Sequence, residues 1–157
     1  MLREDIFHPM VIDCFTYNGE RDILRLHLAI LGGHVDKFII CEARTTFTRK
    51  PKPLYFFRDQ RYFKAWWPQI EYHVIDDQYT DEEFMLAKSS PNTKGAEHWT
   101  WEFLQKERIL KALAQSNVKD DDLVFIGDVD EIWAAQHVLQ YLNCEGYIPG
   151  NHFWEKQ

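Results

Sequence analysis

Short apolar runs alternate with longer amphipathic stretches along most of this chain. The runs are rich in Val, Ile and Phe, which is typical of strands covered on both faces of a sheet. Strands are predicted at residues 10–17, 35–41, 70–75 and 123–126, with a further strand at 147–153. Helices are predicted at residues 20–31, 54–66, 97–116 and 135–142. The polar stretch 76–94 is predicted to be a loop that contains one turn of helix at 82–87.

The order of these elements predicts an α/β domain. Strands that alternate with helices form a mostly parallel, Rossmann-like sheet with helices on both faces. Ligands of such sheets bind beyond the carboxyl ends of the strands. Acidic residues follow the predicted strands: Glu20, Glu42, Asp76, Asp77, Asp128 and Asp130. They favour a divalent cation at this edge, although acidic residues that cap the following helices would give the same pattern.

Asp128 and Asp130 are the most specific candidates for a metal site. They follow the apolar run at 123–126, and residues two apart on a strand face the same side. Carboxylate oxygens suit Mg²⁺ or Mn²⁺, and such ions bridge substrate phosphates. A second Asp-x-Asp triplet, Asp120 to Asp122, precedes the strand and lies at the opposite end of the predicted sheet. Position therefore favours Asp128 and Asp130.

Composition excludes several classes of protein. The chain has 157 residues, of which 45% are hydrophobic and 27% charged, as is typical of one globular domain. No apolar run reaches the ~20 residues of a membrane span. Three cysteines without a C-x-x-C pair predict reduced thiols, and a net charge of −7 argues against nucleic acid as a partner. Gly-rich nucleotide fingerprints and the G-x-S-x-G hydrolase motif are absent from the sequence.

One stretch of this acidic chain is basic. Arg and Lys occupy seven positions from Arg44 to Lys64, and Asp59 is the only acidic residue among them. The stretch begins where the second predicted strand ends, so Lys50 and Lys52 are candidates for phosphate contact. A solvated helix face would explain the same residues.

The predicted helix at 97–116 carries a charged pair beside its apolar face. The apolar residues at helical spacing are Trp99, Phe103, Leu110 and Ala114. Glu107 and Arg108 lie next to this stripe. A carboxylate in such a place needs a partner, so the two residues predict either an internal ion pair or a pair that reaches the ligand-binding edge.

Five separated blocks of sequence occur in an order that resembles a known family. The blocks are Cys14 to Glu20, Asp22 to Leu24, Val35 to Ala43, Thr46 to Phe56 and Asp128 to Ile132. Together they resemble glycosyltransferase family 17 over most of residues 10–132. The resemblance implies an enzyme with a GT-A fold, in which an Asp-x-Asp motif holds a divalent metal on the diphosphate of a nucleotide sugar. It also implies that residues 1–157 are a single nucleotide-sugar-binding domain, the N-terminal part of a longer catalytic domain.

The same resemblance implies a reaction and its participants. A sugar such as N-acetylglucosamine is transferred from a UDP-sugar to a hydroxyl of a glycan or glycoprotein acceptor, with Mn²⁺ or Mg²⁺ as cofactor. The implied location is the Golgi lumen for a piece of an animal-type enzyme, and the cytoplasm or the membrane periphery for a microbial one. A sugar nucleotidyltransferase and a non-catalytic module that binds nucleotide sugars or glycans are the alternatives.

The resemblance also implies roles for residues at the predicted edge. Asp128 and Asp130 would hold the metal, and Asp128 also contacts the UDP. Nucleotide contact is expected of Tyr17, Asn18, Glu20, Glu42 and Arg108, with Glu42 accepting a hydrogen bond from the base. Lys50 and Lys52 would neutralise charge on the departing diphosphate. The sequence does not identify the carboxylate that takes the proton of the acceptor hydroxyl, and Glu131 is one candidate.

Overall fold

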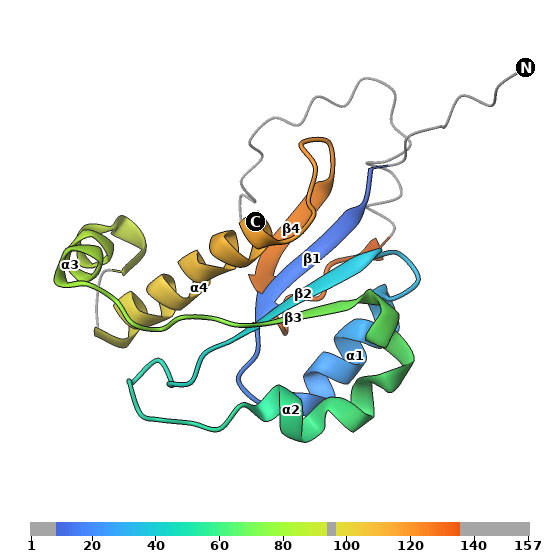
Figure 1. Ribbon diagram of the computed structural model, residues 1–157, viewed down its shortest axis with the longest axis horizontal. Coiled ribbons are helices and arrows are strands. Elements are labelled where there is room, and N and C mark those ends of the chain that lie inside the picture. Colours follow the sequence, from blue (N-terminus) through green and yellow to red (C-terminus); the bar gives the residue numbers. More distant parts are fainter. Residues whose placement is uncertain (1–8, 94–96, 136–157) are drawn as a thin grey trace, which may run out of the picture.

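The computed structural model describes residues 9–93 and 97–135 (Figure 1). Its strands are β1 (Val11–Thr16), β2 (Lys37–Glu42), β3 (Ile70–Val74) and β4 (Leu123–Asp128). Its α-helices are α1 (Arg21–Leu31), α2 (Tyr55–Asp59), α3 (Asp81–Ser89) and α4 (Glu97–Gln115). Two 3-10 helices, η1 (Gln60–Gln69) and η2 (Pro91–Thr93), complete the regular elements of the described residues.

The four strands form one parallel sheet in the order β3-β2-β1-β4. In the central strand β1, Cys14 pairs with Ile39 of β2 on one side and with Ile126 of β4 on the other. Every pairing is parallel, which confirms the predicted α/β class. The order changes direction at β1, because β2 and β3 extend the sheet one way and β4 the other. Open α/β sheets bind their ligands at such a switch point.

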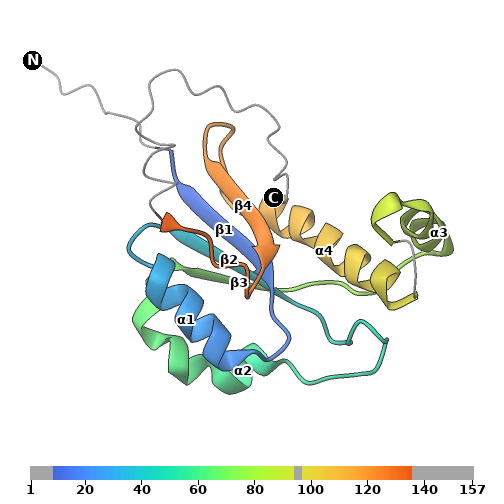
Figure 2. The ribbon, with the colours of Figure 1, turned by 180° about the vertical axis from the view of Figure 1, so that it is seen from behind.

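Helices cover both faces of the sheet (Figures 1 and 2). Successive residues of a strand point to opposite faces. Phe15 accordingly belongs to a buried cluster with Leu28 of α1, whereas Cys14 belongs to a second cluster with Ile109 of α4. The continuous apolar runs of β1 and β2 follow from this burial on both sides.

Two helical segments differ from the prediction. The helix expected at 54–66 is a short α-helix, α2, that continues as the 3-10 helix η1. The stretch expected to be mostly loop contains α3, which begins with a capping box. In this box Glu83 N donates to Thr80 Oγ1 at 3.1 Å, and Thr80 N donates to Glu83 Oε2 at 2.9 Å. Apart from Ala135, the helix expected at 135–142 and the strand expected at 147–153 lie outside the described residues.

The apolar face predicted for α4 is wrong. The buried residues of this helix are Thr100, Leu104, Gln105, Arg108, Ile109 and Ala112. Trp99 and Leu110, which were expected inside, are 48% and 52% exposed. Gln105 and Arg108 occupy the interior because they donate hydrogen bonds to backbone carbonyls of neighbouring loops. These bonds offset the cost of burying polar groups.

Two cysteines lie in the sheet, on the face that α4 covers. Cys14 and Cys41 are buried and free, as predicted, whereas Cys144 lies outside the described residues. Burial raises the pKa of both thiols, that of Cys41 to about 12, so neither is a thiolate at neutral pH. Among the helices of residues 9–93 and 97–135, none is long and apolar enough to cross a membrane.

Candidate functional site

The carboxyl ends of β1 and β4 lie side by side. Thr16, the last residue of β1, is in register with Asp128, the last residue of β4. Residues near these two ends line a cavity of about 260 Å³. The lining residues are Thr16, Asn18, Glu20, Ile23, Phe47, Glu102, Asp128, Val129 and Asp130. Four of the predicted site residues therefore meet at this edge, namely Asn18, Glu20, Asp128 and Asp130.

Residues 128–131 form a tight turn, which we call the acidic turn. Glu131 N donates to Asp128 O at 2.9 Å, and Asp128 N donates to Glu131 Oε2 at 3.0 Å. Because β4 ends at Asp128, Asp130 is not on the strand, and the expected strand alternation is wrong for this pair. The turn brings the two carboxylates to the same cavity instead.

A buried histidine contacts the backbone of Val129, within the acidic turn. His27 Nδ1, on α1, lies 2.7 Å from the carbonyl oxygen of Val129. His27 Nε2 lies 2.7 Å from Asp13 Oδ2, on β1. All three residues are buried. The acidic turn is therefore anchored to both α1 and β1, which fixes the place where Asp128 and Asp130 leave the backbone.

The cavity is strongly acidic. Four carboxylates line it, those of Glu20, Glu102, Asp128 and Asp130. Lys106 Nζ lies 3.0 Å from Glu102 Oε1 and 2.8 Å from Asp128 Oδ1. Asp130 is exposed, and its carboxylate has no hydrogen-bond or ion-pair partner within the described part of the chain. A phosphate would be repelled from this cavity unless a cation accompanied it.

The donor atoms of the acidic turn fit a hard divalent cation. Carboxylate oxygens are preferred ligands of Mg²⁺ and Mn²⁺, and Asp128 and Asp130 line one cavity. Among residues 9–93 and 97–135, no three His, Cys, Asp or Glu side chains are grouped so as to hold a metal ion. Two carboxylates would leave the remaining ligand positions of such an ion to water and to substrate phosphates, which are common ligands of Mg²⁺.

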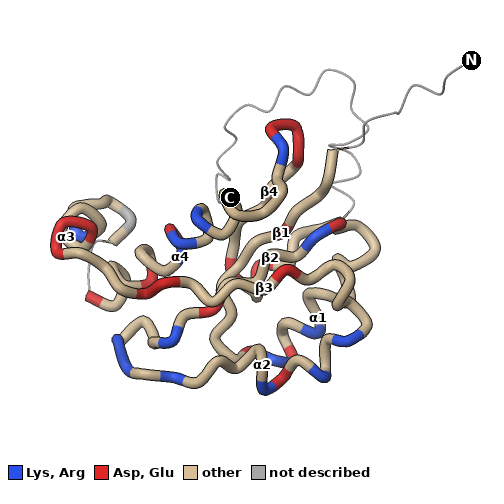
Figure 3. Tube along the Cα trace, viewed as in Figure 1, with Lys and Arg blue, Asp and Glu red and all other residues tan. Residues whose placement is uncertain are grey.

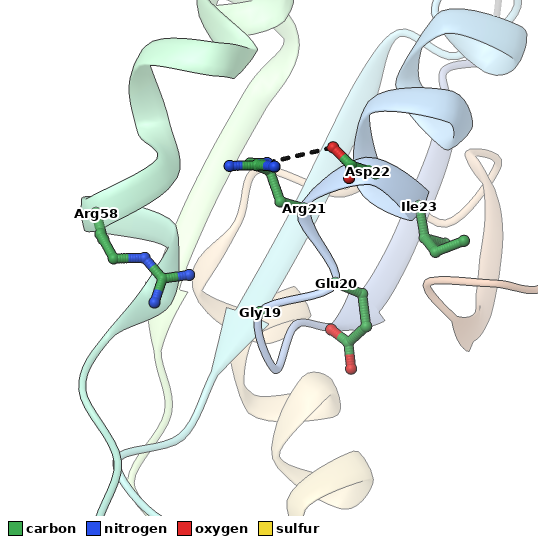
Figure 4. Close-up of a pocket in the computed structure, with 6 residues that line it drawn as sticks. All are labelled: Gly19, Glu20, Arg21, Asp22, Ile23 and Arg58. Atoms are coloured by element: carbon green, nitrogen blue, oxygen red, sulfur yellow. Dashed lines mark hydrogen bonds and ion pairs between the residues drawn. The ribbon is translucent and has the colours of Figure 1, made fainter.

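The loop after β1 is a tight turn shaped by Gly19. Its φ of 105° favours glycine, and a Cβ at this position would lie 2.9 Å from Tyr55 Cδ2. Figure 4 shows a second cavity, of about 510 Å³, at the start of α1, which Glu20 lines together with Arg21 and Arg58; within it the side chain of Glu20 projects away from the two arginines. Each of these arginines pairs with the aspartate that follows it in the sequence. The Gly19 turn therefore directs Glu20 away from both guanidinium groups.

Tyr17 does not reach the acidic cavity. Its side chain is fully buried, and its hydroxyl donates to Asp59 Oδ2 at 3.2 Å. The ring packs edge-on against Phe56 and Phe63. Burial, together with the charge of Asp59, raises the pKa of Tyr17. These contacts join β1 to α2 and η1 and leave Tyr17 no access to a nucleotide, in contrast to the expectation.

Glu42 is also used by the fold. It is fully buried, and its carboxylate accepts four hydrogen bonds. The donors are Tyr55 N at 2.7 Å, Phe56 N at 3.0 Å, Lys52 Nζ at 3.0 Å and Tyr72 Oη at 2.9 Å. A carboxylate has about four lone-pair positions, so no acceptor remains for the expected bond from a nucleotide base. Lys52, whose side chain is 3% exposed, is enclosed in the same ion pair.

Arg108 holds the loop after β3 against α4. Its Nη1 donates to Glu83 Oε1 at 2.9 Å, and its Nε and Nη2 donate to the carbonyl oxygens of Asp76 and Gln78 at 3.1 and 3.0 Å. Glu107 is exposed. Of the two roles predicted for this pair, Arg108 makes the internal ion pair, with Glu83 as its partner. Its guanidinium is therefore engaged away from the acidic cavity.

Basic residues gather on the loop between β2 and α2 (Figure 3). Arg49 folds back onto the protein, because its Nη1 donates to Asp77 O at 2.9 Å and its guanidinium lies 4.7 Å from the centre of the Trp101 ring. Lys50 is exposed. Of the two lysines expected to contact phosphate, Lys50 is thus accessible and Lys52 is not.

Glu131 has one oxygen in the acidic turn. Its Oε2 accepts the bond from Asp128 N, whereas its Oε1 has no hydrogen-bond partner among the described residues. Glu131 lines an adjacent cavity of about 420 Å³, which also contains the stacked rings of Phe125 and Trp133. Asp128 and Asp130 border this cavity as well. Glu131 therefore lines a different cavity from Asn18 and Glu20, and the two aspartates line both.

Sequence reasoning missed two groups at this site. Glu102 and Lys106 are four residues apart on α4, a spacing that predicts an ion pair but gives no sign of the contact with Asp128. His27 gave no signal, because its partners Asp13 and Val129 are 14 and 102 residues away in the sequence. Both groups act on the acidic turn through contacts that only the folded chain creates.

The sequence matches the family model of glycosyltransferase family 17 over residues 3–154. The chain belongs to this family. Its relatives include the beta-1,4-mannosyl-glycoprotein 4-beta-N-acetylglucosaminyltransferases of Homo sapiens and Rattus norvegicus, each 27% identical over 129 residues. The match covers 82% of this family 17 chain but only 23% and 22% of the two relatives, so the chain spans less than a quarter of their length. No solved structure gives a significant match.

Proposed function

We propose that this family 17 chain binds the sugar donor in a metal-dependent glycosyl transfer. The sugar, N-acetylglucosamine, would pass from a UDP-sugar to a hydroxyl of a glycan or glycoprotein. The family match and the names of the two relatives support this class of reaction. The observation that carries the proposal is the cavity in which Asn18 and Glu20 of the β1 loop meet Asp128 and Asp130 of the acidic turn.

The charge of the cavity supports the need for a cation. A UDP diphosphate is negative, and four carboxylates line the cavity that would receive it. Mn²⁺ or Mg²⁺ held by Asp128 and Asp130 would neutralise the charge that develops on the departing diphosphate. Exposed Lys50 is the residue of the basic loop that we propose to contact the same phosphates.

The remaining polar residues of the site suit the sugar and ribose hydroxyls of the donor. The side-chain amide of Asn18 both donates and accepts hydrogen bonds, and the carboxylate of Glu20 accepts them. Pockets for whole drug-sized ligands measure roughly 300–1,000 Å³, so the cavity of about 260 Å³ fits a part of a nucleotide sugar. Glu131 is the proposed proton acceptor, because its Oε1 is unpartnered within the described chain and it borders the adjacent cavity.

Calorimetry tests the metal-dependent binding of the donor. The protein is titrated with UDP in Mn²⁺ and again in EDTA, and we expect binding to be much tighter with Mn²⁺. Asp130→Ala should remove this difference. Asp120→Ala is the matched control, because Asp120 is an exposed aspartate that precedes β4, whereas Asp130 follows it. Equal affinity of the wild-type protein for UDP in Mn²⁺ and in EDTA would contradict the proposal.

A turnover assay separates transfer from the alternative functions. With a glycan acceptor present, we expect its hydroxyl to take N-acetylglucosamine from UDP-N-acetylglucosamine with release of UDP, and Glu131→Gln to slow this release while UDP binding is kept. Pyrophosphate release from UTP and a sugar phosphate would instead indicate a nucleotidyltransferase. Tight, metal-dependent UDP binding with no UDP release would indicate a binding module.

A further inference from the structure

The ammonium group of Lys106 contacts the acidic turn at the carboxylate of Asp128, where a metal ion would bind. Its Nζ lies 2.8 Å from Oδ1 and 2.9 Å from Oδ2 of Asp128, and 3.0 Å from Oε1 of Glu102. An ammonium group is charged at neutral pH, and both oxygens of Asp128 lie within hydrogen-bond distance of it.

The two aspartates of the turn are not equivalent. Asp128 is paired with Lys106, whereas the carboxylate of Asp130 has no partner among residues 9–93 and 97–135. A divalent cation that approaches Asp130 can be bound without breaking a contact there. At Asp128 the same cation meets an ammonium group that is already bound, and the two positive charges repel each other.

Glu102 is a second carboxylate partner for the ammonium group of Lys106. It lies four residues before Lys106 on α4 and is already one of its partners, so Lys106 keeps an ion pair when Asp128 is taken from it. Glu102 also lines the acidic cavity. The exchange therefore needs no movement of the helix, only a change in which carboxylate the ammonium contacts.

We propose that Lys106 is an exchangeable counter-ion of the acidic turn, which pairs with Asp128 in the metal-free protein and is left with Glu102 when a divalent cation binds Asp128. This inference rests on the proposed function, because it assumes a cation at Asp128 and Asp130. Lys106 is thus a positioning residue that neutralises the turn in the free protein and sets the cation concentration at which the site fills.

Direct titration with Mn²⁺, without nucleotide, tests this inference. Free Mn²⁺ is followed by electron paramagnetic resonance in the wild-type protein, Lys106→Gln and Lys106→Arg. Removing a group that supports a metal ligand typically lowers metal affinity by about 10- to 100-fold, and removing a competing charge should act on a similar scale in the opposite direction. We expect Lys106→Gln to bind Mn²⁺ at least about tenfold more tightly, because its competitor is gone, and Lys106→Arg to stay close to wild type. Lys111→Gln, at an exposed lysine further along α4, is the control for the general loss of one positive charge.

Two results would overturn the inference. One is an Mn²⁺ affinity of Lys106→Gln that equals or falls below that of the wild type, and the other is the same increase in Lys111→Gln. A second measurement uses the unaltered protein: on addition of Mg²⁺ the side-chain nitrogen resonance of Lys106 should shift, and that of Lys111 should not. If Asp130→Ala removes the metal dependence of UDP binding while Lys106→Gln has no effect on Mn²⁺, the proposed function stands and this inference fails.

Discussion

His27 and Asp13 form a buried hydrogen-bonded pair, with 2.7 Å between Nε2 and Oδ2. The other ring nitrogen of His27 lies 2.7 Å from the carbonyl oxygen of Val129, which can only accept a hydrogen bond, so Nδ1 carries a hydrogen. Nε2 and Asp13 Oδ2 must then share a second hydrogen. The pair is an imidazolium with a carboxylate or a neutral imidazole with a carboxylic acid, and in both cases its net charge is zero.

Replacing His27 should destabilise the protein strongly. His27→Leu leaves Asp13 buried without its partner and the Val129 carbonyl without a donor, which should lower the free energy of unfolding by about 3–5 kcal/mol in urea titrations. Asp13→Asn should cost only about 1 kcal/mol, because the amide can donate to Nε2 of a neutral imidazole. An equal loss in the two variants would show that the pair does not share a hydrogen in this way.

Glu42→Gln should affect stability and leave UDP binding unchanged. Glutamine cannot accept the four bonds that the carboxylate accepts from Lys52, Tyr72 and the start of α2. Breaking the buried ion pair between Glu42 and Lys52 should lower the free energy of unfolding by about 3 kcal/mol, measured by urea denaturation. Calorimetry on the folded variant should give the wild-type affinity for UDP. Weaker UDP binding with normal stability would instead restore Glu42 to the nucleotide site.

Gly127→Ala should act through Glu131. A Cβ at residue 127 would lie 2.7 Å from Glu131 Oε2. The carboxylate of Glu131 must therefore move, which breaks the hydrogen bond that it accepts from Asp128 N. The loss of this exposed hydrogen bond should cost about 1 kcal/mol of unfolding free energy. In a double-mutant cycle Gly127→Ala should add little to Glu131→Ala, because both remove the same bond. Additive losses would contradict this explanation.

The stability of the protein should fall in acid partly through Glu71. Burial would raise the pKa of Glu71, but hydrogen bonds from Lys37, Ser116 and His73 lower it to about 2 from its usual 4.5. A carboxyl with a lowered pKa in the folded state stabilises the protein above its unfolded pKa, and this contribution disappears between about pH 4.5 and pH 2.

Glu71→Gln is the test of this pH dependence. The side chain is 30% exposed, and solvent screening reduces the effect of its ion pairs. We expect a loss of about 1.5 kcal/mol in the free energy of unfolding at pH 7 and little difference from wild type near pH 2. Urea titrations at both pH values measure this difference. The same difference in the free energy of unfolding at pH 7 and at pH 2 would contradict the role of Glu71.

The sheet could be predicted from the sequence because its strands are locally encoded. Phe38 to Cys41 and Leu123 to Ile126 are apolar without interruption, as buried parallel strands are. The start of α3 was not predicted, although Thr80 and Glu83 have the spacing of a capping box. The buried face of α4 was not predicted either, because Gln105 and Arg108 are buried only by virtue of carbonyl groups on distant loops.

The sequence predicted that the loops after β1 and β4 meet at one edge of the sheet, but it did not predict the contacts of every side chain there. Asn18, Glu20, Asp128 and Asp130 share one cavity because strand order places their loops together. Glu42 has the same local context, at the end of a parallel strand, but backbone donors at the start of α2 and the ammonium group of Lys52 occupy its carboxylate. Which carboxylate binds a ligand and which caps a helix depends on such neighbours, and a strand end alone does not distinguish them.

The pairing of β1 with β4 has a consequence for biosynthesis. Val11 lies opposite Leu123, so β1 is synthesised more than a hundred residues before its neighbour on that side. Pairing over such a separation is slow and occurs late in folding. A nascent chain that contains β1, β2 and β3 but not β4 lacks Asp128 and Asp130 of the cavity, so cation binding there would report that β4 has docked.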